Sequence, residues 1–223
     1  MSNAVLIIGQ SGTGKSTAIR TLPPEETFII NVLDKPLPFR GSAKKYQVPT
    51  KDNPKGNYFA TDKAAKIIEL LDAIDHRRPE IKYVVLDDFG YVMTQHFMAT
   101  AMQKGYDKFS EMCVASWNVI NRLKAMRPDI ISFFTMHSDV KDDGIAKPKT
   151  IGKMTDEKVC IEGMVTYVFH SVIVDGQYKF ATNHNNAVMA KTPMGCFTDM
   201  LIDNDLLAIA NAIKSYMNED IPQ

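Results

Sequence analysis

The stretch Gly9-Gln10-Ser11-Gly12-Thr13-Gly14-Lys15-Ser16 decides how the rest of this 223-residue chain is interpreted. It satisfies the pattern G-x-x-x-x-G-K-S/T at every position. The apolar run from Val5 to Ile8 precedes it and predicts a buried strand, and a helix is predicted to start near Lys15. A strand, a glycine-rich turn and a helix are the context that a phosphate-binding loop requires. We therefore expect phosphate groups to bind at this loop.

Each residue type in the loop suits a nucleotide. The glycines let the backbone N–H groups approach phosphate oxygens closely, Lys15 is expected to reach the β- and γ-phosphates, and the Ser16 hydroxyl is a ligand for Mg²⁺. The predicted nucleotide-binding residues run consecutively: Gly9, Gln10, Ser11, Gly12, Thr13, Gly14, Lys15, Ser16 and Thr17. ATP and Mg²⁺ are the expected cofactors.

The composition excludes several other classes of protein. The chain has 26 Lys and Arg residues and 26 Asp and Glu residues, so its formal net charge is zero. A net charge of zero does not favour binding to nucleic acid or to an anionic membrane, so any such surface must be local. The three cysteines are far apart in the sequence, which indicates neither a disulfide framework nor a zinc site. No charged leader and no apolar span of membrane length is present, so we expect a cytoplasmic protein that does not contact membranes.

The hydrophobic pattern predicts one α/β domain over residues 1–223. Four apolar strands alternate with helices, which is typical of a mostly parallel sheet flanked by helices, and the Asp175-Gly176 turn predicts an antiparallel hairpin near the C-terminus. Residues 35–60 are rich in proline and glycine and predict an irregular insertion with an edge strand at 46–48, and a polar, mobile loop is expected over 138–156. Helices are predicted from Thr61 to 76 and over 91–104, 110–126 and 205–217.

Paired aspartates close the apolar run from Tyr83 to Leu86. A phosphate loop needs a carboxylate that anchors Mg²⁺ from the end of a strand beside the loop strand, and Asp87 fits that role. Asp88 points elsewhere and is a candidate general base for an attacking water. Asp34, at the end of the second strand, is a rival base. The alternative for all three is a structural role without catalysis, as an aspartate that caps a strand or faces solvent.

Two further features are candidates for function. His137 follows the strand FFTM directly, so it is predicted to emerge near the γ-phosphate as a sensor of hydrolysis. Two lysine-rich segments are candidates for single-stranded DNA, or else ordinary solvated loops. The first segment contains Lys147, Lys149, Lys153 and Lys158, of which the last two are also candidates to reach a neighbouring subunit's nucleotide. The second segment, 35–55, contains Lys35, Arg40, Lys44, Lys45, Lys51 and Lys55 against the single acid Asp52.

Six segments together resemble a known family. They are the loop at 9–16, LPPEETFIINVLDKPLPFRG, VVLDDFGYVM, FFTMHSD, KTIGKMTDEK and AKTPMGCF. Residues 4–217 resemble bacteriophage P-loop ATPases with a RecA-like core, and within them the phage single-strand annealing ATPases, reduced relatives of the RecA and UvsX recombinases. The resemblance implies a P-loop NTPase fold and an ATPase that forms homo-oligomers on single-stranded DNA.

The resemblance also implies roles for individual residues. Lys15, Ser16 and Asp87 match the nucleotide and metal positions, His137 matches the polar sensor, and the loop from Ser138 to Asp156 takes the place of a DNA-binding loop. RecA-type enzymes carry a catalytic glutamate at the end of the second strand, where this chain has Asp34. The shorter side chain implies slow hydrolysis, or the use of Asp88 instead.

The leading functional hypothesis is an ATP-dependent, single-strand-binding protein of DNA recombination or annealing, in which ATP orders the 138–156 loop and hydrolysis releases the DNA. A small-molecule P-loop kinase is an alternative, although such an enzyme needs an arginine-bearing lid, and the chain offers little beyond Arg77-Arg78. A nucleotide-dependent scaffold for replication or packaging proteins is the third hypothesis.

Overall fold

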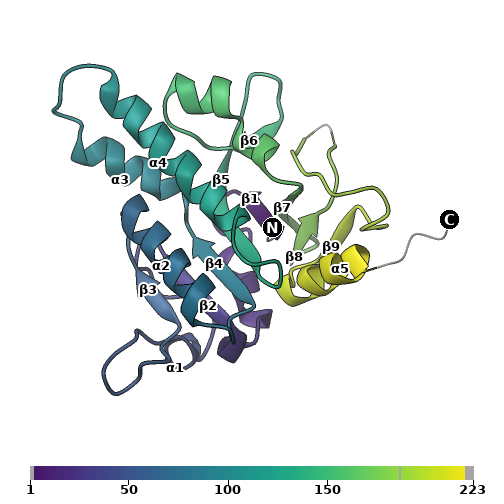
Figure 1. Ribbon diagram of the computed structural model, residues 1–223. Helices are drawn as coiled ribbons and strands as arrows, with labels where there is room; N and C mark the ends of the chain where they lie inside the picture. The colour runs from purple at the N-terminus through teal and green to yellow at the C-terminus, as the bar shows by residue number, and fades with distance from the viewer. Residues whose placement is uncertain (1–2, 186, 219–223) are drawn as a thin grey trace.

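The computed structural model describes residues 3–185 and 187–218, and its centre is a single twisted sheet (Figure 1). The strand order is β3-β2-β4-β5-β1-β7-β8-β9, and β6 pairs with the far end of β5. The strands are β1 (Asn3–Gly9), β2 (Thr27–Asn31), β3 (Tyr58–Ala60), β4 (Tyr83–Asp87), β5 (Ile131–Val140), β6 (Ala146–Pro148), β7 (Tyr167–Val174), β8 (Gln177–Ala181) and β9 (Leu201–Asp203). The pairs from β3 across to β7 are all parallel, so the predicted mostly parallel α/β sheet is confirmed.

Strand order corrects one expectation. The strand that ends in Asp87, β4, does not lie beside β1, because β5 lies between them. Gly9 at the end of β1 aligns with His137 of β5, and Asn31 at the end of β2 aligns with Asp87. The carboxyl ends of four strands therefore meet at one edge of the sheet, where ligands bind in folds of this class.

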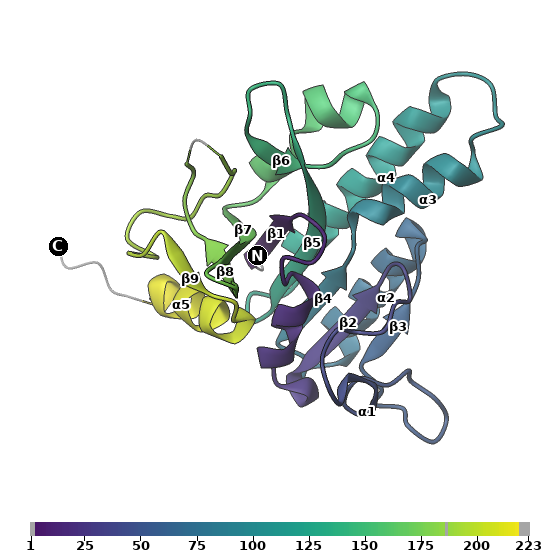
Figure 2. The same cartoon turned by 180° about the vertical axis from the view of Figure 1, so that it is seen from behind.

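Alternating residues of the strands face two separate apolar layers, as the two-residue period of a strand requires. On one face pack α2 (Ala64–Arg77), α3 (Gly90–Ala99) and α4 (Asp107–Lys124), and their buried side chains meet those of Leu6 and Phe134. On the other face α5 (Leu206–Asn218) covers Val5 and Phe133. Figure 2, seen from behind, shows α5 at the end of the sheet opposite to α2 and β3. Helices therefore pack on both faces of the sheet.

The C-terminal part of the described chain is antiparallel. β7 and β8 pair across the turn Asp175-Gly176, where both residues have positive φ, of 50° and 74°, as a tight hairpin needs. β9 then pairs with β8, and α5 lies where the helix over 205–217 was predicted. Among residues 3–185 and 187–218, no helix combines the length and the apolarity that a membrane span needs.

Two predicted irregular segments contain regular structure. No strand forms at 46–48: a four-residue helix, α1 (Ser42–Lys45), ends there, and β3 at Tyr58–Ala60 is the edge strand instead. In the 138–156 segment, β5 continues to Val140 and pairs with β6, and a short π-helix follows over Met154–Val159. Part of this predicted loop is therefore a β-ribbon above the sheet, and its mobility stays a prediction.

Candidate nucleotide-binding site

The glycine-rich loop leaves the carboxyl end of β1 and turns back over the sheet edge. Gly12 and Gly14 have φ of 79° and 97°, in the left-handed region that favours glycine. A Cβ at Gly14 would lie 2.7 Å from the Tyr178 ring, so the β7–β8 hairpin packs directly against the loop. The helix predicted to start near Lys15 is present, but it is not an α-helix. It is a 3-10 helix over Ser16–Thr21, closed by the two prolines that follow Leu22.

Lys15 lies back over its own loop. Its Nζ donates hydrogen bonds to the carbonyl oxygens of Gly9, at 2.8 Å, and Gln10, at 2.7 Å. Burial lowers the pKa of Lys15 to about 8, and the nearby carboxylates of Asp88 and Asp87 oppose that shift. An ammonium has three N–H groups, so one remains for an anion in the loop.

The first aspartate, Asp87, contacts the loop directly. Ser16 Oγ donates to Asp87 Oδ1 at 2.9 Å, and Thr135 Oγ1, from the intervening strand β5, donates to the same oxygen at 2.9 Å. Thr135 thus bridges the gap that β5 creates between β1 and β4. Burial, together with the charge of Asp88, raises the pKa of Asp87 to about 6.

A hydroxyl and a carboxylate in contact are oxygen ligands of the kind that Mg²⁺ prefers. Within the described residues, no group of three or more His, Cys, Asp or Glu side chains can hold a metal. Mg²⁺ commonly binds through one or two protein ligands and completes its shell with water and substrate phosphates. Ser16 and Asp87 are therefore the residues that would hold it.

The buried charge of Asp87 predicts a pH-dependent stability. Between its ordinary pKa of 3.8 and its folded pKa of about 6, the folded state binds the proton more tightly than the unfolded state. The contribution of Asp87 to the free energy of unfolding should therefore fall as pH rises through this window. We expect Asp87→Asn to raise the metal-free Tm at pH 8 by about 2 °C or more. Thermal unfolding in EDTA at pH 5 and pH 8 measures this, and an equal pH response of wild type and variant would contradict it.

The second aspartate, Asp88, is buried at the carboxyl edge of the sheet, directly after β4. It adopts φ of 60°, and its backbone N–H donates to Thr135 Oγ1 at 2.7 Å. Its buried carboxylate has two cationic or potentially cationic neighbours: Lys35 Nζ lies 2.6 Å from Oδ2, and His137 Nε2 lies 3.7 Å from Oδ1. Burial and the charge of Lys15 lower the pKa of His137, so the ring is mainly neutral at pH 7 and accepts or donates as its tautomer allows.

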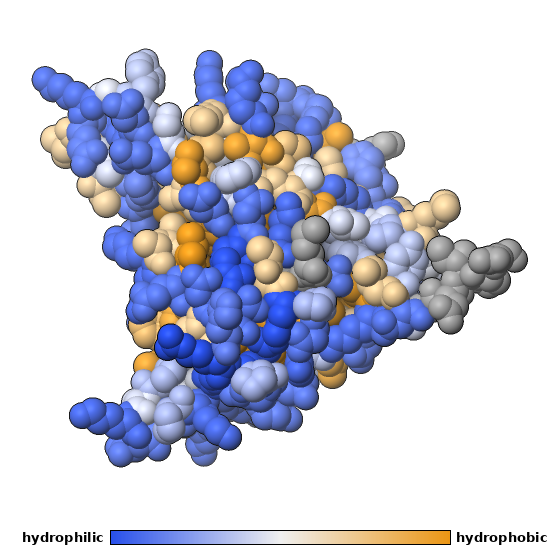
Figure 3. Space-filling view, in the orientation of Figure 1, coloured by the Kyte–Doolittle hydropathy of each residue, from blue (hydrophilic) through white to orange (hydrophobic). Residues whose placement is uncertain are grey.

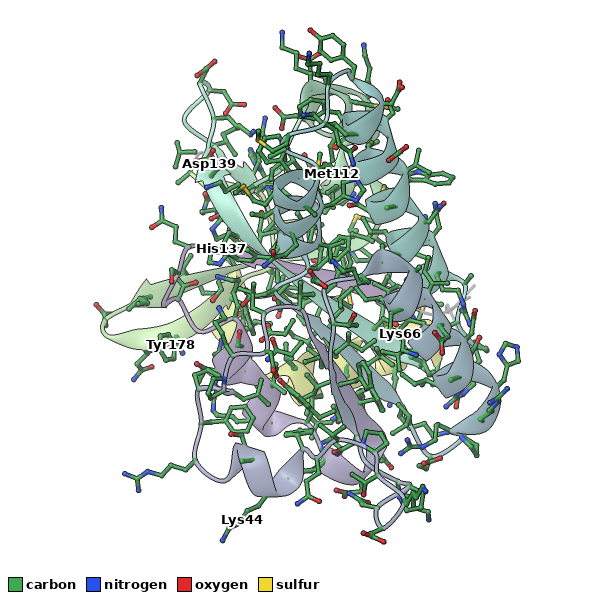
Figure 4. The ribbon with its side chains drawn as sticks, turned by 90° about the vertical axis from the view of Figure 1, so that its left-hand side faces the viewer. Lys44, Lys66, Met112, His137, Asp139 and Tyr178 are labelled. Carbon is green, nitrogen blue, oxygen red and sulfur yellow. The ribbon has the colours of Figure 1, made fainter. Side chains whose placement is uncertain are left out.

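The two neighbours of Asp88, Lys35 and His137, line a cavity of about 600 Å³. Its walls come from the start of the loop, the turn after β2, α3 and the end of β5, and include Gln10, Ser11, Lys35, Tyr91, His137 and Lys149. Figure 4 shows His137 at this edge, between the β7–β8 hairpin that carries Tyr178 and the helical layer that carries Met112. Loop, carboxylates and histidine from four segments of the sequence thus meet at one place.

The rival base Asp34 faces a different cavity. Its Oδ1 accepts a hydrogen bond of 3.0 Å from the Tyr58 hydroxyl, and burial and this bond raise the pKa of Tyr58 to about 12. Asp34 is exposed and lines a neighbouring cavity of about 470 Å³ with Pro36, Leu37 and Tyr46. The geometry therefore favours Asp88 over Asp34 as the group beside the loop.

Sequence patterns did not identify three polar contacts that brace the loop from the C-terminal half. Ser171 Oγ donates to the Thr13 carbonyl, and the buried Asn204 donates through Nδ2 to the Gly14 carbonyl at 3.1 Å. Arg20 Nη1 in turn donates to Asn204 Oδ1 at 2.7 Å. No local pattern signals such partners, because they lie more than 150 residues from the loop in sequence.

The four lysines predicted to bind DNA lie in mixed surroundings. Lys147 pairs with Asp143 at 2.7 Å, and Lys149 lines the cavity beside His137. Lys153 and Lys158 are exposed. A groove of about 720 Å³ along this segment is mainly acidic: it is lined by Asp139, Asp142, Asp143, Asp156, Glu157 and Glu162 against Lys141 and Lys147. The DNA-binding role of this segment stays a prediction.

The comparison with protein families agrees with the geometry. A family model described as an AAA domain matches residues 1–194, a range that includes the whole loop, both aspartates and His137. No curated protein matches the chain. The match supports the P-loop NTPase class and a nucleotide-binding ATPase that uses ATP and Mg²⁺, whereas the recombinase and phage relationships stay predictions. The chain belongs to the AAA domain family of P-loop NTPases.

Proposed function

We propose that this chain hydrolyses ATP to ADP and phosphate, with Asp88 as the general base. One observation carries the proposal: the 2.9 Å hydrogen bond from Ser16 to Asp87 joins the phosphate loop to the paired aspartates across 71 residues of sequence. A phosphate cradle, a magnesium carboxylate and a second carboxylate free of the metal then lie at one edge of the sheet. That is the set of groups that hydrolysis of a phosphoanhydride needs.

The residues divide the chemistry between them. Backbone N–H groups of the loop and the ammonium of Lys15 bind the β- and γ-phosphates and fix their orientation. Ser16 and Asp87 would hold Mg²⁺, which would supply positive charge against the phosphate oxygens. Asp88 accepts a proton from the attacking water as its oxygen bonds to the γ-phosphorus. The bond from that phosphorus to the bridging oxygen breaks, and the bridging oxygen leaves with the electron pair as part of ADP.

Phosphate release from purified protein and ATP tests the proposal. We expect release in Mg²⁺ and none in EDTA. The small-molecule kinase alternative predicts instead that radioactive γ-phosphate appears on an added nucleoside or nucleotide. Phosphate release that is absent with Mg²⁺ under all conditions, while ATP binds, would favour the scaffold alternative over hydrolysis.

We propose single-stranded DNA as a partner on the surface around α1, in place of the acidic groove near β6. Five basic residues of the segment 35–55 are exposed there: Arg40, Lys44, Lys45, Lys51 and Lys55. The acids of this surface are Asp52, which is exposed, and Glu25 and Glu80, which line a hollow with Lys44, Lys45 and Lys55. Their region is predominantly hydrophilic in Figure 3, and Lys44 points away from the molecule in Figure 4. Exposed cations near an aromatic residue, here Tyr58, are the combination that single strands use.

Paired charge removals distinguish the two surfaces. We expect Lys44→Gln/Lys45→Gln to weaken binding of an oligothymidine by about 10-fold at low salt, and to reduce the slope of log K against log salt by about 0.7 for each phosphate that the variant no longer neutralises. Lys153→Gln/Lys158→Gln, which removes the same charge from the other segment, should change the affinity less than about twofold. The reverse ranking would restore the 138–156 segment as the DNA site. No binding by the wild type, with or without ATP, would remove DNA as a partner.

A further inference from the structure

Lys35 lines the cavity but has no role in the proposed hydrolysis of ATP. Its ion pair with Asp88 is asymmetric: 57% of the Lys35 side chain is exposed, against 4% for Asp88. The buried carboxylate would suffer a desolvation penalty without this partner, whereas the lysine can exchange the contact for water at little cost. Lys35 is therefore the member of the pair that can leave it when another anion is offered.

The backbone that carries Lys35 is fixed. The buried Asn31, at the end of β2, donates through Nδ2 to the Lys35 carbonyl at 2.8 Å and accepts from Leu33 N–H at 3.1 Å. Asn31 aligns with Asp87 across the β2–β4 pair, so this turn is held at the level of the paired aspartates. Lys35 lines both this cavity and the neighbouring one that contains Asp34. Its ammonium can therefore move while the backbone that carries it stays in place.

The start of the phosphate loop lines the same cavity as Lys35. Gln10 and Ser11 line it together with Lys35 and His137. Lys15 lies within range of the charge of Lys35, and both lysines are close to the carboxylates of Asp87 and Asp88. Without nucleotide, the two lysines balance the two aspartates. A bound triphosphate adds negative charge that exceeds the charge of one Mg²⁺, so it competes with Asp88 for the nearest free ammonium.

We propose that Lys35 distinguishes ATP from ADP. Without a γ-phosphate the ammonium pairs with Asp88, and with one it moves to a γ-phosphate oxygen and leaves the Asp88 carboxylate free to accept the proton of water. This inference rests on the proposed ATPase function and names a residue that makes the same site specific for the triphosphate.

Lys35 acts in this scheme as a charge and not as an acid. The ion pair with Asp88 raises the pKa of Lys35 against the opposing effect of its partial burial, so the side chain keeps its proton throughout. An anionic γ-phosphate in place of the carboxylate favours the protonated form in the same way.

Binding of two nucleotides to three variants tests this role. The probes are ADP and the β,γ-imido analogue of ATP, which is not hydrolysed, both with Mg²⁺. We expect Lys35→Met to raise the Kd of the analogue about 10-fold or more, because the variant cannot form a charged hydrogen bond to phosphate, and to change the Kd of ADP less than about twofold. Lys35→Arg keeps the charge and should restore most of the difference.

Lys66→Met is the matched control. Lys66 also forms an ion pair, with Glu69 at 2.7 Å, but it lies on α2 and does not line the cavity. Figure 4 shows it on the helical layer, away from His137. The Lys66→Met variant should leave both Kd values unchanged. Equal weakening of both nucleotides by Lys35→Met, or no weakening of either, would overturn the inference and leave the ATPase function standing. A wild type that binds neither nucleotide would overturn the ATPase function and the inference with it.

Discussion

Lys15→Ala should abolish ATP hydrolysis while leaving the fold intact. The ammonium is the one buried cation of the loop, and the side chain ends where the loop carbonyls of Gly9 and Gln10 converge. Removal of a charged donor from a preorganised phosphate site costs about 100-fold or more in rate, and about 10-fold or more in affinity. Because the pKa of Lys15 is lowered to about 8, ATP affinity of the wild type should also fall as pH rises through 8.

Phosphate release and the Kd of ATP at about pH 7 and pH 9, on either side of this pKa, measure these effects. Lys179→Ala is a suitable control, since Lys179 is a lysine on β8 that pairs with the exposed Asp203 at 2.6 Å. The Lys179→Ala variant should retain the wild-type rate of ATP hydrolysis. A Lys15→Ala protein that hydrolyses ATP at close to the wild-type rate, with an unchanged Tm, would show that phosphate binds elsewhere and that the loop is only a turn.

Local signals in the sequence were sufficient for the loop and for the strands around it. The apolar run before Gly9 and the run before Asp87 each predict a buried strand. Such predictions need only local sequence, because a strand and the turn that ends it are recognised from a few consecutive residues. The same signals placed Asp87 and Asp88 at a strand end. They also placed His137 directly after its strand, and this was wrong, because β5 continues through His137 to Val140; His137 lies level with Gly9 at the end of β1. Since parallel strands share one carboxyl edge, these residues could be expected to meet without any knowledge of strand order.

Strand order and distant partners depend on packing that no local pattern records. Nothing in the sequence near β4 shows that β5 separates it from β1, so the bridging role of Thr135 could not be derived. Lys35 looked like one member of a basic segment, and only the turn held by Asn31 brings it to Asp88. Asp34 was predicted at the end of the second strand, but β2 already ends at Asn31 and Asp34 lies in the turn that follows. Its φ of 52° and its bond to Tyr58 direct it into the neighbouring cavity.

The proline-rich and lysine-rich segments were the least predictable parts. Proline and glycine indicate where regular structure ends, but they do not show whether a short strand can pair with an existing edge. β3 forms at Tyr58–Ala60 because the edge of β2 is available to it, and β6 forms because β5 extends beyond the sheet. Pairing partners that exist only after folding decide both cases.

Asp88→Asn should separate binding from hydrolysis. The substitution removes the carboxylate that accepts the proton, so we expect the rate of phosphate release to fall by about 100- to 10,000-fold. Asparagine tolerates the left-handed φ of 60° at this position better than alanine does, and its amide keeps the size of the side chain, so the turn after β4 should hold. The loss of one negative charge beside the phosphates should leave ATP affinity equal or tighter.

Asp34→Asn is the matched test of the rival assignment, because it makes the same chemical change at the other strand end. We expect it to leave the rate close to that of the wild type, since Asp34 lines the neighbouring cavity and contacts Tyr58 instead of the phosphate loop. If Asp34→Asn stops hydrolysis and Asp88→Asn does not, the base follows the position seen in RecA-type enzymes, and the water must approach from the Tyr58 side. If Asp88→Asn alone stops it, the second of the paired aspartates is the base. Lys35, which holds that carboxylate before ATP binds, then controls when it becomes available.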